Sequence, residues 1–185
     1  SGSVQRARSL RFGYLPQEAI LEGVHTLWEE CLKSLADIQE IETELARLED
    51  AMSDPSQADA ALQRYGPLQV EFERLGGYTY MTRIEQVLTG LGFDASDYHR
   101  PVNQLSGGQR TRAVLARLLL ASPDLLIMDE PTNHLDISAV EWLESYLNQW
   151  EGAVLIVSHD RYFLDKVVDH IWEMRKDGLE TYRGN

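Results

Sequence analysis

A short apolar run followed by two carboxylates constrains the fold more than any other feature of the sequence. Leu125 to Met128 are four large apolar residues in succession, which predicts a strand buried on both faces of a parallel sheet. Asp129 and Glu130 follow at once, and Pro131 ends the strand because it lacks a backbone N–H. Ligands of open α/β sheets bind at the carboxyl ends of the strands, where an Asp-Glu pair suits hydrated Mg²⁺ and an activated water. Taken alone, such a pair is more often a solvated strand end.

Two further strands also end in polar residues. The apolar run from Ala153 to Val157 predicts a second buried strand, and Ser158-His159-Asp160 follows it. Ser9 to Leu15 predicts a third strand, with Gln17 just beyond its end. An isolated His159 would more often be a structural histidine, but its place after a strand of the same sheet favours a role beside the carboxylates.

A glycine-rich turn precedes the carboxylates along the chain. Ser106, Gly107, Gly108 and Gln109 lead into an apolar helix pattern from Ala113 to Leu120. Ser106 is a suitable N-cap, and the glycines let the backbone approach an anion at a helix N-terminus. The same helix carries three arginines, which form either a solvated face or a phosphate-facing one: Arg110, Arg112 and Arg117.

Residues 26–75 predict a helical hairpin. The pattern is helical from Thr26 to Met52. Apolar residues recur alternately every three and four positions in two seams, one before and one after the turn Ser53-Asp54-Pro55-Ser56. Two seams joined by a tight turn indicate antiparallel helices. Gly66-Pro67 predicts a kink or break in the second helix.

The hairpin is strongly acidic. Between Glu29 and Arg74 it has twelve Asp or Glu residues and four Lys or Arg residues, and the 185-residue chain has a formal net charge of −13. Such a charge excludes a surface that coats nucleic acid generally. Three interpretations of the hairpin stay open: a solvated outer face, an arm that docks on a basic partner, or an arm that holds two modules apart.

Composition narrows the class of protein. The chain is 43% hydrophobic and 25% charged, as in ordinary globular proteins. Its single cysteine, Cys31, cannot form an internal disulfide and fits a reducing compartment. No apolar run approaches the length of a membrane-spanning helix, and no signal peptide is evident. We therefore expect a cytoplasmic protein that does not bind a membrane.

The other predicted elements are ordinary. We expect a helix from Tyr80 to Leu91, a helix capped by Ser138 and ending near Asn148, and a short helix from Tyr162 to Val168. His170 to Met174 and Leu179 to Tyr182 predict a terminal β-hairpin around Lys176-Asp177-Gly178.

In chain order these features resemble the motifs of the ABC ATPase family. They correspond to a Gln loop at Gln17, the signature Leu105-Ser106-Gly107-Gly108-Gln109, a Walker B strand ending in Asp129-Glu130, Asn133-His134-Leu135-Asp136, and Ser158-His159-Asp160. The Asn-His pair, the spacing of 88 residues from Gln17 to Leu105, and the ending Tyr182-Arg183-Gly184-Asn185 are similar to ABC-F proteins. These are soluble tandem-ABC ATPases, many of which act on the ribosome, with a helical arm inserted in the first module.

The resemblance implies an α/β fold. We expect part of a P-loop NTPase parallel-sheet core together with an α-helical subdomain that carries the hairpin arm. Residues 1–18 would supply a core strand and the Gln loop, and residues 19–104 the helical subdomain with the arm at about 26–75. Residues 105–185 would supply the signature helix, Walker B strand, D-loop, H-loop and the rest of the core.

The family implies ATP and Mg²⁺ as cofactors. By position, Asp129 would hold Mg²⁺, Gln17 would contact Mg²⁺ and sense the γ-phosphate, Glu130 would act on the attacking water, and His159 would hydrogen-bond the phosphate. Positioned donors and a metal stabilise charge on a transferring phosphoryl group.

The remaining motif residues would act across an interface. In the family two ATP molecules lie between two ABC modules, so the second module of the same protein is an expected partner. The signature residues would complete the other module's site: Ser106, Gly107, Gly108 and Gln109. Asp136 would belong to the loop that couples the two sites.

One element of the family is missing. No phosphate-binding loop of the form GxxxxGK[ST] occurs in the sequence. We therefore expect a fragment of a longer ATP hydrolase, which by itself binds ATP poorly and hardly hydrolyses it.

The leading functional expectation is an ATP-driven, ribosome-associated switch in translation. Its arm would contact rRNA or a basic ribosomal protein, and ATP would close the modules. An alternative is the ATPase subunit of an ABC membrane transporter, which the long acidic hairpin and the Asn-His pair disfavour. A non-catalytic interaction module is a third class, disfavoured for the parent protein by the intact Glu130 and His159.

Overall fold

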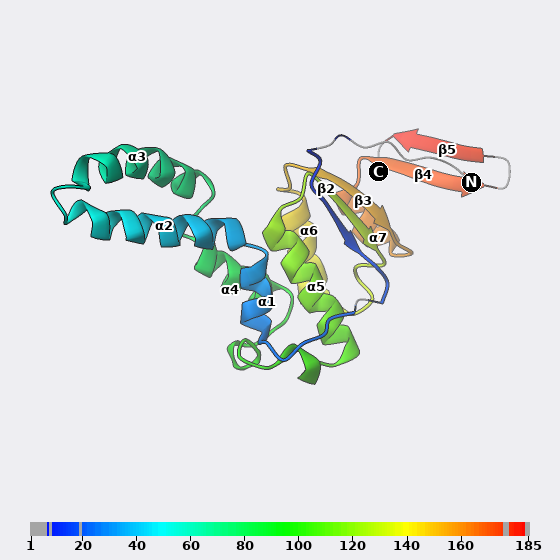
Figure 1. Cartoon of the computed structure of the whole chain (residues 1–185). Helices are drawn as coiled ribbons and strands as arrows, with labels where there is room; N and C mark the ends of the chain where they lie inside the picture. Colours follow the sequence, from blue (N-terminus) through cyan, green and yellow to red (C-terminus); the bar gives the residue numbers. More distant parts are fainter. Residues whose placement is uncertain (1–6, 8, 19, 176–177, 184–185) are drawn as a thin grey trace.

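Three parallel strands form the centre of the molecule. The computed structural model describes residues 7, 9–18, 20–175 and 178–183. The strands are β1 (Phe12–Leu15), β2 (Leu125–Asp129) and β3 (Ala153–Val157), in the order β1-β2-β3 (Figure 1). The structure thus confirms the predicted parallel α/β sheet, with the carboxylate-bearing strand in the middle.

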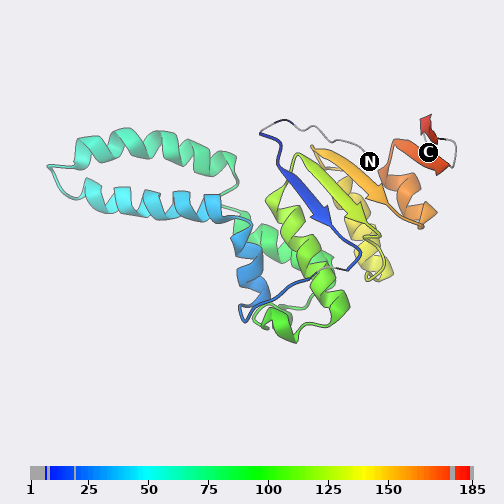
Figure 2. The same cartoon turned by 45° about the vertical axis from the view of Figure 1, so that its right-hand side comes forward.

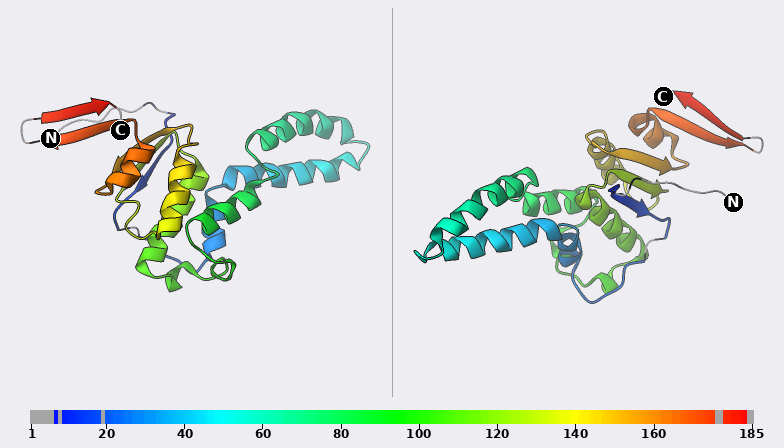
Figure 3. Two further views of the ribbon diagram at one scale, coloured as in Figure 1. Left: turned by 180° about the vertical axis from the view of Figure 1, so that it is seen from behind. Right: turned by 45° about the horizontal axis from the view of Figure 1, so that its top comes forward.

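Helices cover one face of this sheet. They are α5 (Gly107–Ala121), α6 (Ile137–Leu147) and α7 (Arg161–Val167), seen from behind in Figure 3. Leu126 and Met128 of β2 are fully buried on this side. A Cβ at Gly13 of β1 would lie 3.0 Å from the Leu118 side chain, so the glycine lets α5 pack closely on the strand.

The prediction that the strands are buried on both faces is wrong for the described residues. Tyr14, Leu155 and Val157 project from the face opposite the helices and are exposed, Val157 by 57%. Successive side chains of a strand point to opposite faces, and the helices pack on only one of them. The apolar runs therefore predicted the strands correctly, but they did not predict that the second face of the sheet is exposed.

The helical pattern that starts at Thr26 is divided between two helices. The first, α1 (Leu27–Lys33), begins with a capping box between Thr26 and Glu29 and packs against α5. The second, α2 (Ala36–Met52), begins after a break at 34–35 and leaves the core. The predicted continuous helix from Thr26 to Met52 is wrong, because packing of α1 on α5 fixes a direction different from that of α2.

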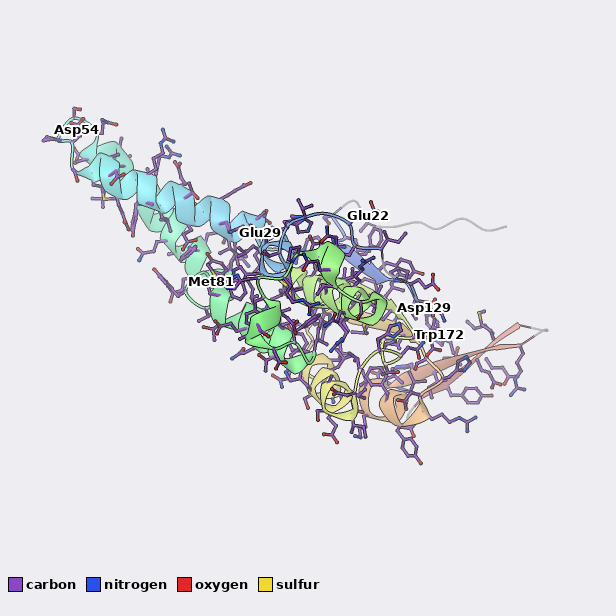
Figure 4. The ribbon with its side chains drawn as sticks, turned by 90° about the horizontal axis from the view of Figure 1, so that it is seen from below. Glu22, Glu29, Asp54, Met81, Asp129 and Trp172 are labelled. Carbon is purple, nitrogen blue, oxygen red and sulfur yellow. The ribbon has the colours of Figure 1, made fainter. Side chains whose placement is uncertain are left out.

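The predicted antiparallel hairpin is confirmed. It consists of α2 and α3 (Ala58–Arg74) and projects away from the sheet (Figures 1 and 2). We call α2, α3 and the turn between them the arm. Its seam buries Leu45, Leu48 and Phe72, and Arg64 bonds Glu44 across the pair at 2.7 Å. Asp54 marks its tip, far from Asp129 in the core (Figure 4).

The second arm helix runs through Pro67 without a break. A single helix spans residues 58–74, so the predicted interruption at Gly66-Pro67 is wrong. The helix is instead arched away from α2 (Figure 1). An interior proline removes one helical hydrogen bond, and its ring presses on the carbonyl four residues earlier, which bends a helix.

A buried carboxylate ties α1 to α5. The Glu30 carboxylate lies 2.6 Å from His25 Nε2, 3.0 Å from Lys33 Nζ and 2.6 Å from Arg117 Nη1, and only 3% of its side chain is exposed. Burial opposes its ionisation, but hydrogen bonds from Lys33 and His25 and the charge of Arg117 outweigh it, so the pKa of Glu30 lies below its ordinary value. We call Glu30 and its three partners the Glu30 cluster.

The remaining elements complete the helical part and the carboxyl-terminal part. As predicted, α4 (Tyr80–Gly90) is a helix, and it also packs on α5. Two 3₁₀ turns, Ala95–Asp97 and Val102–Gln104, lead into α5. The predicted terminal hairpin is formed by β4 (His170–Arg175) and β5 (Gly178–Arg183), while Lys176 and Asp177 lie outside the described residues.

Two smaller expectations can be checked in the described part of the chain. No helix there combines the length and hydropathy needed to cross a bilayer. Cys31 is a buried free thiol on α1, and burial together with the charge of Glu30 raises its pKa to about 12. It is therefore a packing residue, because a reactive thiol needs a lowered pKa and exposure.

Candidate functional site

The carboxyl ends of the three strands meet at one edge of the sheet. Leu15 pairs with Met128, and Met128 pairs with Ile156. Asp129 is therefore the last residue of the central strand, and Gln17 and His159 follow the two strands in register on either side of it, as the sequence predicted. Gln17 and Asp129 are more than a hundred residues apart in the chain, so the sheet itself assembles this edge.

Glu130 has an unusual backbone conformation. Its φ of +49° is left-handed, which is uncommon for a residue other than glycine and stores strain. The Glu130 N–H donates to the carbonyl of Val157 on β3 at 2.8 Å. The carboxylate accepts a long hydrogen bond from the His159 N–H at 3.4 Å, and its side chain is 12% exposed. This conformation turns the carboxylate across the sheet edge toward the end of β3.

His159 presents its ring to solvent. Its imidazole is fully exposed, and Nε2 lies 3.8 Å from Glu130 Oε1, too far for a hydrogen bond. The neighbouring residues hold the loop: the Asp160 N–H donates to Ser158 Oγ at 3.1 Å, and the Asp160 carboxylate caps α7 by accepting from the Phe163 N–H. The loop is thus fixed while the imidazole stays available for a ligand.

The donors at this edge fit Mg²⁺ bound together with phosphate. In the described part of the chain, the Asp129 carboxylate takes no hydrogen bond or ion pair, so its oxygens are available. No cluster of three or more His, Cys, Asp or Glu side chains suited to a metal occurs among those same residues. Mg²⁺ does not need such a cage, because it usually binds one or two protein oxygens, water and substrate phosphates. Asp129 and the amide oxygen of Gln17 are donors of that kind.

The glycine-rich turn opens α5 as predicted. Ser106 is the N-cap and accepts from the Gln109 N–H at 3.2 Å, while Gln109 Oε1 accepts from the Ser106 N–H at 3.0 Å. A Cβ at Gly107 would meet no atom within 4 Å, so the helix faces open space at this position. The reciprocal role of Gln109 was missed in the sequence, although the Ser-x-x-Gln spacing signals it.

The loop after Glu130 reaches this turn. A Cβ at Gly108 would lie 3.4 Å from His134, so the two segments are in contact. Asp136 caps α6 by accepting from the Ala139 N–H at 2.8 Å. The predicted cap, Ser138, is wrong because the helix begins one residue earlier, at Ile137, with the charged acceptor before it.

All three arginines of α5 make hydrogen bonds within the fold, so they do not form a purely solvated face. Arg110 donates to the carbonyl of Asn103, Arg112 to the carbonyls of Leu91 and Gly92, and Arg117 to Glu30. Their hydrogen bonds hold the neighbouring loops and α1 in place around α5.

The predicted site residues fall into two groups. Gln17, Asp129, Glu130 and His159 share the sheet edge, whereas Ser106, Gly107, Gly108 and Gln109 open α5 beside the loop that ends at Asp136. Across the described residues no hydrogen bond or ion pair joins one group to the other. This division is what two half-sites would require, each completed by another module.

Comparison with known sequences places the chain among ATP-binding cassettes. The ABC transporter family matches residues 3–133. The chain is 45% identical to YdiF of Bacillus subtilis (strain 168), covering all of this chain and 29% of that protein. It is 40% identical to ABC transporter F family member 3 of Arabidopsis thaliana, covering 86% of this chain and 22% of that protein.

A translation protein is also among the relatives. The energy-dependent translational throttle protein EttA of Haemophilus influenzae is 35% identical, covering all of this chain and 33% of that protein. The chain therefore spans about a third or less of these relatives' length.

A solved structure gives the same fold. The complex of an archaeal ribosomal stalk protein with the archaeal ribosome recycling factor aABCE1 matches with a TM-score of 0.59 at 21% identity, covering 98% of this chain and 28% of that one. At that identity the likeness extends to the fold alone.

Proposed function

The chain belongs to the ABC transporter family as an ABC-F-type ATPase module, and from that premise we propose that it is part of a ribosome-associated ATPase that regulates translation. ATP-driven closure of two ABC modules would control ribosome binding. The observation that carries the proposal is the sheet edge, where available Asp129 and strained Glu130 lie beside an exposed His159.

Each residue of the edge has a chemical task in hydrolysis. Asp129 and Gln17 would hold Mg²⁺, which neutralises charge on the phosphates when it is bound with ATP. Glu130 would orient a water and accept its proton, and its largely buried carboxylate points toward the end of β3. His159 would donate a hydrogen bond to a phosphate oxygen.

The first turn of α5 would act on the second ATP. Its free backbone N–H groups and the aligned helix dipole favour an anion. Gly107 leaves the approach open, and the capping box between Ser106 and Gln109 holds the turn in shape. In this proposal the phosphate-binding loop and the second module are supplied outside these residues, and the loop ending at Asp136 couples the two sites.

The ribosomal part of the proposal draws on the relatives and the arm. EttA is named a translational throttle protein, and a second relative is an F family member. The arm extends far from the sheet edge, as an element for contact with a partner would (Figure 2). The corresponding location of the protein would be the cytoplasm.

Ribosome co-sedimentation tests this function. The protein that carries the chain would be studied with Glu130→Gln and the matching change in the second module, which should retain ATP without hydrolysing it. We expect ATP-dependent pelleting with ribosomes, lost when residues 36–74 are replaced by a short Gly-Ser linker. Glu141→Gln, at an exposed position of α6, is the matched control and should pellet like wild type.

The same experiment separates the alternatives. Retention of ATP without any pelleting would contradict the ribosomal function and favour a membrane-transporter or other protein partner. Pelleting that is independent of ATP would contradict the switch.

A further inference from the structure

A pocket lies at the edge of the sheet opposite the candidate site. It has a volume of about 720 Å³ and is formed where the three strands begin and where α5 and α6 end. Its lining consists of Arg11 ahead of β1, Arg83 of α4, Tyr146 of α6, and the segments 122–124 and 149–153 that lead into β2 and β3. No residue assigned above to ATP or Mg²⁺ is among the lining residues that the structure describes. Pockets of this size bind small organic molecules, so the edge has room for a separate ligand.

Arg83 brings a free positive charge to the pocket. Its Nη2 group donates to the Leu119 carbonyl at 3.1 Å and to the Ser122 hydroxyl. Both acceptors are uncharged, and within the described residues Nε and Nη1 of Arg83 make no hydrogen bond and no ion pair. Arg11, the other cation of the lining, lies 3.6 Å from the Asp124 carboxylate and is compensated by it. Arg83 therefore retains donors and a charge for an anion.

Ser122 holds that guanidinium in place. Its φ of +44° is left-handed, a conformation that Glu130 alone shares among the described residues other than glycine. Helices often end in such a residue, but it is usually a glycine. Here the serine hydroxyl accepts from Arg83 and donates to the Leu119 carbonyl at 3.3 Å. The strained turn thus orients a cation on the pocket wall, and strain of this kind gathers at functional sites.

Two aromatic rings form another wall of the pocket. The ring centroids of Tyr146 and Trp150 are 6.1 Å apart, and both residues are partly exposed. Trp150 Nε1 is buried, but it has no hydrogen-bond partner among the described residues. A Cβ on Gly152, which also lines the pocket, would lie 2.7 Å from this nitrogen. Buried donors are nearly always paired, so an unpaired one in a pocket wall indicates an acceptor on a ligand.

One carboxylate of the lining is also free. Glu151 is exposed and makes no hydrogen bond or ion pair within the described residues. Asp124 differs, because its carboxylate accepts from the Arg11 N–H at 2.9 Å and pairs with the guanidinium of the same residue. The lining therefore offers one free cation, one free acceptor of N–H groups and an aromatic surface. A purely apolar ligand would leave the two charges unpaired, and a bare anion would leave the aromatic surface unused.

We propose that the pocket binds a single nucleotide. Its phosphate pairs with Arg83, its base lies against Tyr146 and Trp150, and N–H groups of the base donate to Glu151. Arginine suits phosphate because its donors form a planar fork, and aromatic side chains stack on bases. The nucleotide is either a free nucleoside monophosphate or an unpaired nucleotide of RNA, which present the same chemistry. The site goes beyond the proposed function and does not depend on it, because it shares no residue with the sheet edge that would hold ATP.

Calorimetric titration of the protein that carries the chain tests the pocket. The probe is guanosine 5′-monophosphate, because guanine presents adjacent N–H groups to a carboxylate and a monophosphate lacks the β- and γ-phosphates of ATP. Arg83→Gln and Glu151→Gln should each weaken binding about tenfold. Trp150→Phe, which keeps an aromatic ring but removes the unpaired N–H, should weaken it about fivefold. Arg47→Gln on the arm and Glu141→Gln on α6 are matched controls and should bind like wild type.

Further titrations identify the ligand and separate the two edges of the sheet. Guanosine, which lacks the phosphate, should bind about tenfold more weakly than the monophosphate. His159→Ala, at the other edge, should bind the monophosphate like wild type. Tighter binding of a 5′-phosphorylated RNA trinucleotide than of the monophosphate would support the proposal with RNA as the source, and the reverse order would support it with a free nucleotide.

Several results would overturn the proposal. They are no binding of either probe, equal affinities in the pocket variants and the controls, or loss of monophosphate binding in His159→Ala with the pocket variants unaffected. Thermal unfolding shows whether each variant is folded. If Arg83→Gln is unstable because it loses its bonds at the end of α5, the exposed Glu151→Gln decides the question.

Discussion

Two largely buried glutamates, one in the helical part and one at the sheet edge, have opposite surroundings. Glu30 is enclosed by three basic groups at 3.0 Å or less. Among the residues that the structure describes, Glu130 has one basic neighbour, His159, at 3.8 Å, and it accepts long hydrogen bonds from the end of β3. Glu30 lies in a regular helix, whereas Glu130 has a left-handed backbone.

The contrast separates a carboxylate that joins elements of the fold from one that is left weakly engaged. A carboxylate whose lone pairs are taken by cations joins elements together but has nothing left for a substrate. A carboxylate that is withdrawn from water and weakly engaged can take a proton or orient a water. Strain held at Glu130 fits the second description.

Apart from Glu130 itself, the largest expected effect of a single change is at the exposed imidazole. His159→Ala in the protein that carries the chain should lower the rate of ATP hydrolysis about 10²–10³-fold, as for loss of a donor to developing charge. The unfolding midpoint should stay unchanged, because the ring makes no hydrogen bond to any residue that the structure describes. Phosphate release and thermal unfolding measure both effects. His99→Ala, at another exposed histidine, should leave both unchanged, and equal losses in the two variants would break the comparison.

The next effect is on stability alone. Glu30→Ala should lower the free energy of unfolding by about 3 kcal/mol, because it leaves His25, Lys33 and Arg117 without their counter-charge. We place it at the low end for a broken buried pair because Lys33 and Arg117 are partly exposed. Urea unfolding checks this, with Glu40→Ala as the exposed control. A loss below about 1 kcal/mol would show that the Glu30 cluster does not lock α1 to α5.

Acidification should remove part of the stabilisation that the Glu30 carboxylate provides. The pKa of Glu30 is lowered from 4.5 on folding, so its stabilising effect is fully present above pH 4.5 and is lost as the pH falls through the folded value. The difference in unfolding free energy between wild type and Glu30→Gln should therefore be constant above pH 4.5 and shrink below it. A difference that grows on acidification would contradict the direction of the shift.

The smallest effect is at the helix cap beside the signature turn. Asp136→Ala should lower the free energy of unfolding by about 1 kcal/mol, as for other N-caps. Ser138→Ala should have little effect, since Ser138 is exposed inside the helix. Urea unfolding of the two variants separates them, and the reverse order would restore Ser138 as the cap.

Much of the sheet edge could be predicted because its signals are local. Apolar runs followed by polar residues gave β2 and β3, and parallel strands bring their carboxyl ends together. The Ser106 cap followed from a serine before a helical pattern. The conformation of Glu130 could not be predicted, because it depends on a hydrogen bond to Val157 on another strand.

In the helical part, less of the structure could be predicted from the sequence. Apolar spacing gave the arm, but the break near Ser34 was hidden because the helical pattern continues across it. The packing of α1 on α5 separates it from α2, which leaves the core. Likewise Pro67 marked a disturbance in α3, but whether a proline breaks or arches a helix depends on the packing around it.

The measurement that tests the site most directly is ATP hydrolysis by the Glu130→Gln variant of the protein that carries the chain. Glu141→Gln provides the matched control, and labelled-ATP retention confirms that each variant still binds nucleotide. We predict that Glu130→Gln lowers the hydrolysis rate about 10²–10⁴-fold, with ATP retained and the control unchanged. A variant that binds ATP and hydrolyses it within about threefold of wild type would contradict the assignment of this sheet edge as the hydrolytic site.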